Sequence, residues 1–89
     1  MSYEVRLESR AERELNALPN DVLRRVDAKL RDLATNPRPS GVKKLRGREG
    51  EGWRVRVGGY RILYTVDDAA RVVSIYRIAP RARAYRRGR

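Results

Sequence analysis

The first third of the chain changes from a strand pattern to a helix pattern. Residues 3–8 alternate apolar and charged side chains, which is typical of a strand with one buried face. Ser9 and Glu12 then have the spacing of a capping box, and apolar residues follow at helical intervals. Pro19 interrupts this helix, and a second apolar stripe follows and ends before Pro37. The pattern therefore predicts a strand followed by a hairpin of two helices.

The second half of the chain has the pattern of an antiparallel sheet. Residues 53–57 and 60–66 alternate along two strands, and the two glycines at 58–59 between them indicate a tight hairpin turn. Residues 67–70 turn the chain again into a third strand over 71–78. Since two helices precede an antiparallel meander, we expect an α+β fold with the helices packed on one face of the sheet.

The two-residue turn also predicts which strand residues face one another. It pairs Val57 with Tyr60 and Arg56 with Arg61. Symmetric closure of the next turn would place Arg61 opposite Tyr76. The same closure would place Tyr64 opposite Val73 and Ile62 opposite Ile75. One face is then apolar and holds Trp53, Val55, Val57, Tyr60, Ile62, Tyr64, Val73 and Ile75. We expect the other face to be open and to hold Arg54, Arg56, Arg61, Leu63 and Tyr76.

The composition excludes several classes of active site. The 89-residue chain has no Cys and no His, so it has no disulfide framework, thiolate or imidazole base and no ordinary zinc or haem site. A chain of this length supports one core, and we expect a single domain over residues 1–89 with a basic tail at 80–89. Its first residues are charged and no apolar run approaches the roughly 18 residues of a membrane span. We therefore expect a cytoplasmic protein without a cofactor or a membrane contact.

The net charge of +11 lies entirely in the part of the chain after Pro37. Residues 1–37 carry seven basic and seven acidic side chains, whereas residues 71–89 carry seven Arg and no acid. Coding bias explains Arg in place of Lys, but it does not explain why acidic residues are missing from one half. Concentrated positive charge favours a polyanionic partner. Nucleic acid fits better than a membrane, because the chain has no strongly amphipathic basic helix.

The predicted arginine face is suited to phosphate. Like charges opposite each other cost a sheet about a few tenths of a kcal/mol, so folding alone does not favour Arg56 facing Arg61. Guanidinium groups match phosphate oxygens in bidentate geometry. Tyr76 on this face suits either stacking on a base or packing across strands. Tyr85 in the tail suits a base-stacking or catalytic group, or an anchor that holds the tail against the sheet.

Several segments occur in the order found in one known family. Lys44-Leu45-Arg46-Gly47 is followed by Trp53-Arg54-Val55-Arg56-Val57, then by Gly59-Tyr60-Arg61-Ile62-Leu63-Tyr64, then by residues 78–86. This order covers nearly the whole chain and resembles the RelE/ParE superfamily of toxins. The glycine-tyrosine-arginine strand, combined with an Arg and a Tyr four residues apart near the C-terminus, is the most specific element. Several family members have a His before that Arg, where this chain has Pro80, and Arg54 and Arg56 stand where Lys is common.

The resemblance implies a ribosome-dependent endoribonuclease that cuts mRNA and is neutralised by a RelB-like antitoxin. By motif it places the catalytic residues at Arg54, Arg56, Arg61, Arg81 and Tyr85. We expect further RNA contacts from Lys43, Lys44, Arg46, Tyr76, Arg83 and Arg86, and no metal ligand. Two other functions stay open. One is a ParE-like inhibitor that binds DNA gyrase, and the other is a small RNA-binding module without activity.

A nuclease without histidine needs other groups for its reaction. RNA is cut when its own 2′-hydroxyl attacks the adjacent phosphorus, which requires a base, charge stabilisation and a leaving-group acid. Tyr85 is the candidate base, and neighbouring cations would lower its pKa from about 10. Arg54, Arg56 and Arg61 suit stabilisation of the phosphorane, whereas Arg81 is at most a poor acid. Such a site depends on the ribosome to align the 2′-hydroxyl.

Overall fold

The computed structural model describes residues 2–81, and they form one sheet with two helices against it. The elements in chain order are β1 (Glu4–Leu7), α1 (Ser9–Asn16), α2 (Asn20–Thr35), β2 (Lys43–Lys44), the 3-10 turn η1 (Gly47–Glu49), β3 (Trp53–Val57), β4 (Tyr60–Asp67) and β5 (Val72–Pro80). The predicted order of a strand, two helices and a three-stranded meander is confirmed. The short strand β2 was not expected.

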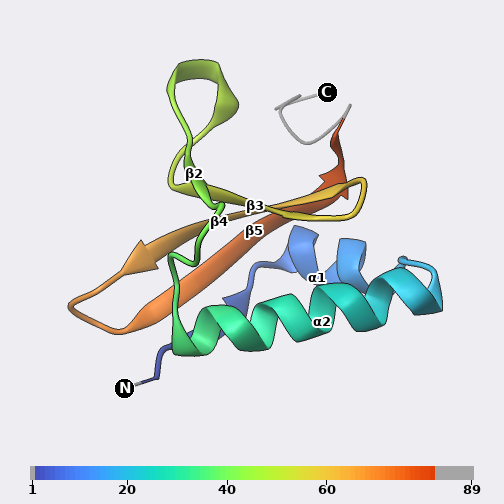
Figure 1. The fold of residues 1–89 in the computed structure, drawn as a ribbon, viewed down its shortest axis with the longest axis horizontal. Helices are drawn as coiled ribbons and strands as arrows, with labels where there is room; N and C mark the ends of the chain where they lie inside the picture. Colours follow the sequence, from blue (N-terminus) through green and yellow to red (C-terminus); the bar gives the residue numbers. More distant parts are fainter. Residues whose placement is uncertain (1, 82–89) are drawn as a thin grey trace.

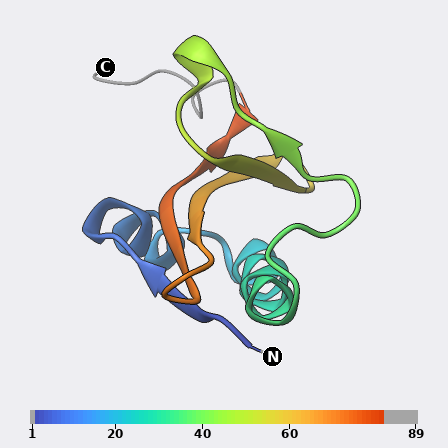
Figure 2. The ribbon, with the colours of Figure 1, turned by 90° about the vertical axis from the view of Figure 1, so that its left-hand side faces the viewer.

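The sheet has five strands in the order β1-β5-β4-β3-β2. The first strand, β1, runs parallel to the last strand, β5, and every other pair is antiparallel. Both helices lie on one side of the sheet, and the segment that contains β2 and η1 stands on the other side (Figures 1 and 2). The α+β class with helices packed on one sheet face is therefore confirmed.

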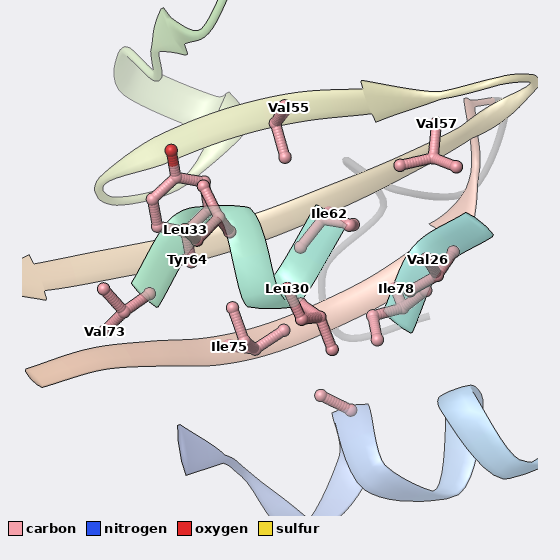
Figure 3. Packing of buried hydrophobic residues seen from close by; sticks show 11 residues of the cluster. Val26, Leu30, Leu33, Val55, Val57, Ile62, Tyr64, Val73, Ile75 and Ile78 are labelled. Atoms are coloured by element: carbon pink, nitrogen blue, oxygen red, sulfur yellow. The ribbon is translucent and has the colours of Figure 1, made fainter. Parts of the chain in front are cut away.

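The core lies between α2 and the central strands. Val26, Leu30 and Leu33 of α2 are buried against side chains of β3, β4 and β5 (Figure 3). The strands contribute Val55, Val57, Ile62, Tyr64, Val73, Ile75 and Ile78. Most of the predicted apolar face is therefore in the core, although Trp53 and Tyr60 are only partly buried. The Tyr64 hydroxyl is satisfied inside the core, since it donates to the Pro37 carbonyl at 2.6 Å.

The predicted capping box at the start of α1 is wrong. Ser9 lies inside the helix, and the preceding residue, Glu8, is the N-cap without a side-chain capping bond. The reason is the neighbouring strand, because the Glu8 amide donates to the Ile75 carbonyl at 2.9 Å. That bond extends the β1–β5 ladder by one residue and keeps Glu8 extended. The helix therefore begins at Ser9, the first residue after the last hydrogen bond to β5.

The predicted register is confirmed for one hairpin and wrong for the next. All five pairs between β3 and β4 are as expected, including Arg56 with Arg61. Between β4 and β5, however, Tyr64 pairs with Ile75 and Arg61 pairs with Ala79. Tyr76 therefore does not lie opposite Arg61.

Two local features cause this difference in register. The β4–β5 turn lies one residue later than predicted, over residues 68–71 in place of 67–70, because Asp67 pairs with Val72. Arg71 adopts the left-handed conformation with φ of 57°, and the Asp67 carboxylate accepts the Ala70 amide at 3.0 Å. Farther along, the pairing shifts between Leu63 and Tyr64, which leaves Tyr76 as the extra residue of a β-bulge.

Candidate nucleic-acid interface

The sheet face opposite the helices carries two rows of side chains across β3, β4 and β5. The register places Arg54, Leu63 and Arg77 in one row and Arg56, Arg61 and Ala79 in the next. Residues that face one another on adjacent strands point to the same side of a sheet. Three neighbouring cations from β3 and β4, Arg54, Arg56 and Arg61, therefore lie on this face of the sheet.

This face is less open than the sequence suggests. Arg54 is 8% exposed and Arg61 is 5% exposed, and only Arg56 is an exposed side chain among these three. The loop between β2 and β3 lies on this side of the sheet (Figure 1). The Tyr76 hydroxyl donates to the Glu51 carbonyl of that loop at 2.7 Å and holds it to β5. The expectation of a fully open face is therefore wrong, because the loop folds back toward it.

Arg61 and Arg81 lie at the same end of the sheet. Arg61 pairs with Ala79, and the Arg81 amide donates to the Gly59 carbonyl at 3.1 Å, beyond the last strand pair. Arg81 is the first residue after β5, and its backbone lies beside the turn that joins β3 to β4. The Arg61 Nη1 also donates to the Tyr60 carbonyl at 3.3 Å. The fold thus places Arg56 opposite Arg61 and the backbone of Arg81 beside the turn at 58–59.

Another cation at this turn was missed from the sequence. A Cβ placed on Gly58 would stand 3.1 Å from Nη2 and 3.3 Å from Nη1 of Arg25. Arg25 belongs to α2, and its position in the sequence indicates only an exposed helix surface. No sequence signal relates it to a turn more than thirty residues later. The positive charge at this end of the sheet is therefore greater than the strands alone supply.

Arg77 is buried but has an acidic partner. Its Nε donates to Oε2 of Glu14 at 2.9 Å, and the other oxygen of Glu14 accepts the Ile78 amide at 2.7 Å. Arg10 adds a weaker contact to the same carboxylate at 3.4 Å. Glu14 lies on α1, so this network fastens the helix to β5 past the end of β1. Arg77 is therefore a structural cation whose charge Glu14 neutralises.

The predicted RNA contacts on β2 and its loop are exposed. Lys43 pairs with Arg54 in the sheet and Lys44 pairs with Trp53. The Lys44 ammonium lies 5.9 Å from the centre of the Trp53 ring. Arg46 precedes η1, where its amide donates to the Glu49 carboxylate at 3.1 Å and leaves its side chain exposed. These three cations can reach a partner, and their contact with RNA stays a prediction.

Acidic side chains of the basic half are engaged in local contacts. Asp68 accepts both Nη atoms of Arg38, at 3.2 and 2.7 Å, and the Tyr3 hydroxyl at 2.6 Å. These bonds, first that from Arg38, lower the pKa of Asp68 to about 2. The same bond raises the pKa of Arg38 above its usual value. The β4–β5 turn thereby holds its carboxylate away from the arginines at the other end of the sheet.

Three of the predicted site residues lie outside the described part of the chain. These are Tyr85, the candidate base, and the two tail arginines Arg83 and Arg86. Among residues 2–81, no group of three or more His, Cys, Asp and Glu side chains is arranged to hold a metal ion. In the same part of the chain, no helix is long and apolar enough to span a membrane. The described arrangement suits binding of oxyanions, because guanidinium groups stay protonated and donate several hydrogen bonds.

Comparisons with known proteins agree with the fold and with the sequence motifs. Residues 5–85 match the family described as the ParE toxin of the type II toxin-antitoxin system parDE. The chain is 39% identical to toxin RelG of Mycobacterium tuberculosis, over 98% of this chain and 100% of that protein. It is 33% identical to the RelE1 protein of Methanocaldococcus jannaschii, over 97% and 98%.

A solved structure shows the same arrangement of elements. In the toxin-antitoxin complex RelBE2 of Mycobacterium tuberculosis, one chain superposes with a TM-score of 0.79 at 34% identity. The match covers 91% of this chain and 100% of that chain. A family match over most of the sequence, and relatives above 30% identity over nearly their full length, agree on one assignment. This chain belongs to the RelE/ParE superfamily of type II toxin-antitoxin toxins.

Proposed function

We propose that this toxin is a ribosome-dependent endoribonuclease that cleaves mRNA and so inhibits translation. The observation that carries the proposal is that Arg56 faces Arg61 across β3 and β4, with the backbone of Arg81 beside the turn that joins these two strands. Folding alone does not favour neighbouring cations, because they repel one another. Neighbouring cations do stabilise the negative charge that builds up on a phosphate as it becomes a phosphorane. The relatives named RelE and RelG support the same class of activity.

The proposed reaction uses the RNA as its own nucleophile. The 2′-hydroxyl loses its proton and forms a bond to the adjacent phosphorus, and the bond to the 5′-oxygen breaks. The products are a 2′,3′-cyclic phosphate and a 5′-hydroxyl, which forms when the leaving 5′-oxygen takes up a proton from the solvent. Arg61 and Arg56 stabilise the negative charge of the phosphorane, and Arg81 binds the leaving side of the phosphate.

Tyr85 is the proposed base. It lies four residues after Arg81, and a phenol surrounded by guanidinium groups has a lowered pKa, because the cations favour the phenolate. The ribosome aligns the 2′-hydroxyl with the phosphorus. This alignment lowers the barrier of the reaction and so compensates for the weakness of the base. We place the reaction in the cytoplasm, where translating ribosomes are found.

We also propose a RelB-like antitoxin as the neutralising partner. The related RelE2 chain of Mycobacterium tuberculosis was solved in a toxin-antitoxin complex. A net charge of +11 favours an acidic segment that folds as it binds. Purification of the toxin from its host together with an acidic chain would support this partner, and purification of the toxin alone from intact cells would count against it.

The direct test adds the purified toxin to ribosomes that carry a defined mRNA and maps the new RNA ends. We expect cuts in the A-site codon, and a loss of at least a hundredfold in rate for Arg61→Ala, Arg81→Ala and Tyr85→Phe, in line with the roughly 10² to 10⁴ contributed by an acid-base group. Arg13→Ala, an exposed arginine on α1, is the matched control and should cleave like the parent chain. Equal cleavage by all four variants would refute the assignment of these residues.

A second candidate follows from the ParE family match. On this alternative the toxin inhibits DNA gyrase by binding, and the arginines serve only contact. Intact mRNA on programmed ribosomes, together with inhibited supercoiling by gyrase, would replace the nuclease with this function. Intact mRNA, active gyrase and normal growth of an expressing strain would leave only an RNA-binding module.

A further inference from the structure

An open strand edge lies beside the proposed catalytic residues. β2 pairs with β3 only at Trp53 and Arg54, so within residues 2–81 no strand covers the outer edge of β3 beyond Arg54. Because the two-residue turn makes Val57 and Tyr60 a hydrogen-bonded pair, the amide of Arg56 points to this outer edge. A pocket of about 430 Å³ lies here. We call it the edge pocket, and it is lined by Lys29, Ser40, Gly41, Lys43, Arg54, Val55 and Arg56.

The edge pocket is cationic. Four of its seven lining residues are basic and none is acidic, and they come from three elements, α2, β2 and β3. Among the described residues, the ion pairs involve Arg6, Arg10, Arg31, Arg38 and Arg77 and none of the four pocket cations. The positive charge of the pocket is therefore not neutralised by the part of the chain that the structure describes.

Arg54 is the unusual member of the edge pocket. It is only 8% exposed, and within residues 2–81 its side chain makes no hydrogen bond or ion pair. The other two buried arginines differ, since Arg77 donates to Glu14 and Arg61 donates to the Tyr60 carbonyl. Among residues 2–81 no nitrogen of Arg54 is fully buried without a partner, so its guanidinium group keeps contact with the solvent at the pocket. An anion bound in the pocket would therefore reach this guanidinium group and give it the partner that the described residues do not.

The position of the pocket indicates which anion. Arg56 lines the edge pocket and also faces Arg61 across the sheet, so the pocket adjoins the proposed catalytic phosphate site. A nucleic-acid strand presents phosphates at short, regular intervals, and a strand with one phosphate at Arg61 has its next ones nearby. Lys29 and Lys43 supply ammonium groups, and the hydroxyl of Ser40 and the outward amide of Arg56 supply neutral donors of hydrogen bonds.

We propose that the edge pocket binds a backbone phosphate of the RNA strand, next to the phosphate that is cleaved. The proposal rests on the proposed function for the identity of the strand as RNA. It adds Lys29 of α2 to the RNA-binding residues. It also gives Arg54 an anchoring role at an uncut phosphate, in place of a role at the reacting phosphorus.

The test measures binding without cleavage. The full-length toxin is titrated into a short fluorescent single-stranded RNA whose 2′-hydroxyls are methylated, so that it cannot be cut, at several salt concentrations. For Lys29→Ala we expect a roughly threefold or larger loss of affinity at low salt. The slope of log K against log salt is negative, and we expect its magnitude to fall by about 0.7, the value for one lost phosphate contact on a single strand. Lys43→Ala should behave in the same way.

Arg24→Ala is the matched control, because Arg24 is an exposed cation on the same helix that does not line the pocket. It should keep the parent slope. Circular dichroism of each variant confirms that it is folded. If Lys29→Ala and Arg24→Ala give the same slope and affinity as each other, the edge pocket binds no phosphate and the proposal is overturned.

Two further outcomes separate this proposal from its alternatives. If an acidic peptide from the antitoxin loses affinity for Lys29→Ala while the methylated RNA does not, the edge pocket is a protein-binding site and the RNA proposal fails. If Lys29→Ala loses RNA affinity as expected but the parent toxin cuts no mRNA on ribosomes, the pocket stands and the nuclease proposal alone fails.

Discussion

Arg56 and Arg61 face each other across two strands, yet their surroundings differ. Arg56 is exposed, whereas Arg61 is 5% exposed and donates to a backbone carbonyl. A buried guanidinium is held in one orientation, and it loses less entropy when it binds a phosphate. An exposed one can move to meet an incoming strand. We infer that Arg61 fixes the position of the reacting phosphate, while Arg56 bridges it to the edge pocket.

Gly52 is the glycine that this architecture requires most strictly. Its φ is +85°, and a Cβ placed on it would collide with the backbone carbonyl oxygen of Tyr64. Gly52 also accepts the Leu45 amide at 2.8 Å, which closes the base of the β2–β3 loop. The residue is therefore needed both for its backbone conformation and for the close approach of the loop to β4.

We expect Gly52→Ala to lower the free energy of unfolding by roughly 2 kcal/mol, because the left-handed conformation and the collision both act against a side chain. Urea denaturation measures this. Gly59→Ala is the control, since a Cβ there meets nothing within 4 Å and its backbone is not left-handed. A Gly52→Ala variant as stable as Gly59→Ala would show that the loop moves away from β4 at little cost.

At the scale of elements, the β4–β5 turn is tied to two distant segments. Asp68 of this turn accepts hydrogen bonds from Arg38, after α2, and from Tyr3, before β1. The ion pair is partly exposed, with 37% of the Arg38 side chain and 56% of the Asp68 side chain accessible. Solvent therefore screens it, and its main effect is on pH dependence and on the position of the loop after α2.

The sign of this pH dependence follows from the lowered pKa of Asp68. Because the folded value is about 2 and the usual value is 3.8, the bonds stabilise the fold above pH of about 4. That stabilisation is lost as the pH falls toward 2. In Asp68→Asn we expect a smaller loss of stability over this interval, measured as the shift in urea midpoint between pH 5 and pH 2. Asp32→Asn, an exposed carboxylate on α2, is the control and should keep the parent dependence.

Local signals in the sequence were enough to predict the pairing or the start of some elements and not of others. The β3–β4 pairing followed from two glycines at 58–59, because a two-residue turn permits a single register. The β4–β5 pairing was mispredicted because the left-handed Arg71 and the bulge at Tyr76 carry no comparable signal. Arginine is not a residue that normally adopts a positive φ. The start of α1 was misplaced because a bond to the distant β5 strand decides it.

The candidate site was predictable to the extent that it depends on strand alternation. Arg56 and Arg61 were placed together from the hairpin alone. The pairing of Arg77 with Glu14, and the approach of Arg25 to Gly58, join segments 63 and 33 positions apart in the sequence. Such contacts depend on how the helices pack on the sheet. The burial of Arg54 likewise depends on a loop whose path the sequence pattern does not indicate.

At the scale of the whole molecule, the net charge of +11 affects both the stability of the fold and the affinity for a polyanion. Added salt changes these two quantities in opposite directions. Self-repulsion among the cations destabilises the compact state, and added salt screens it. The proposed binding to RNA would release counterions, so the same salt would weaken it. We therefore expect the free protein to be least stable at the low salt concentrations that favour the proposed RNA binding most.

We expect the melting temperature of the free toxin to rise when sodium chloride is increased from low to moderate concentration, while its affinity for single-stranded RNA falls. Differential scanning fluorimetry and fluorescence anisotropy measure the two effects in the same buffers. Added single-stranded RNA should raise the melting temperature at low salt, because a ligand of the native state stabilises it. A melting temperature that is independent of salt would show that the cations do not repel one another appreciably.

The parallel pairing of β1 with β5 has a consequence for when the protein becomes active. Glu4 pairs with Val72, and β5 lies between β1 and β4 in the sheet. The strand β1 therefore finds its partner only after β5 has been synthesised. A growing chain without β5 has no partner for β1, no bonds from Glu14 to Arg77, and no Arg81 beside the turn. The hairpin that pairs Arg56 with Arg61 can form earlier, but Arg81 reaches the turn at 58–59 only when β5 is in place. The proposed site is therefore complete only after the last strand of the sheet has joined it.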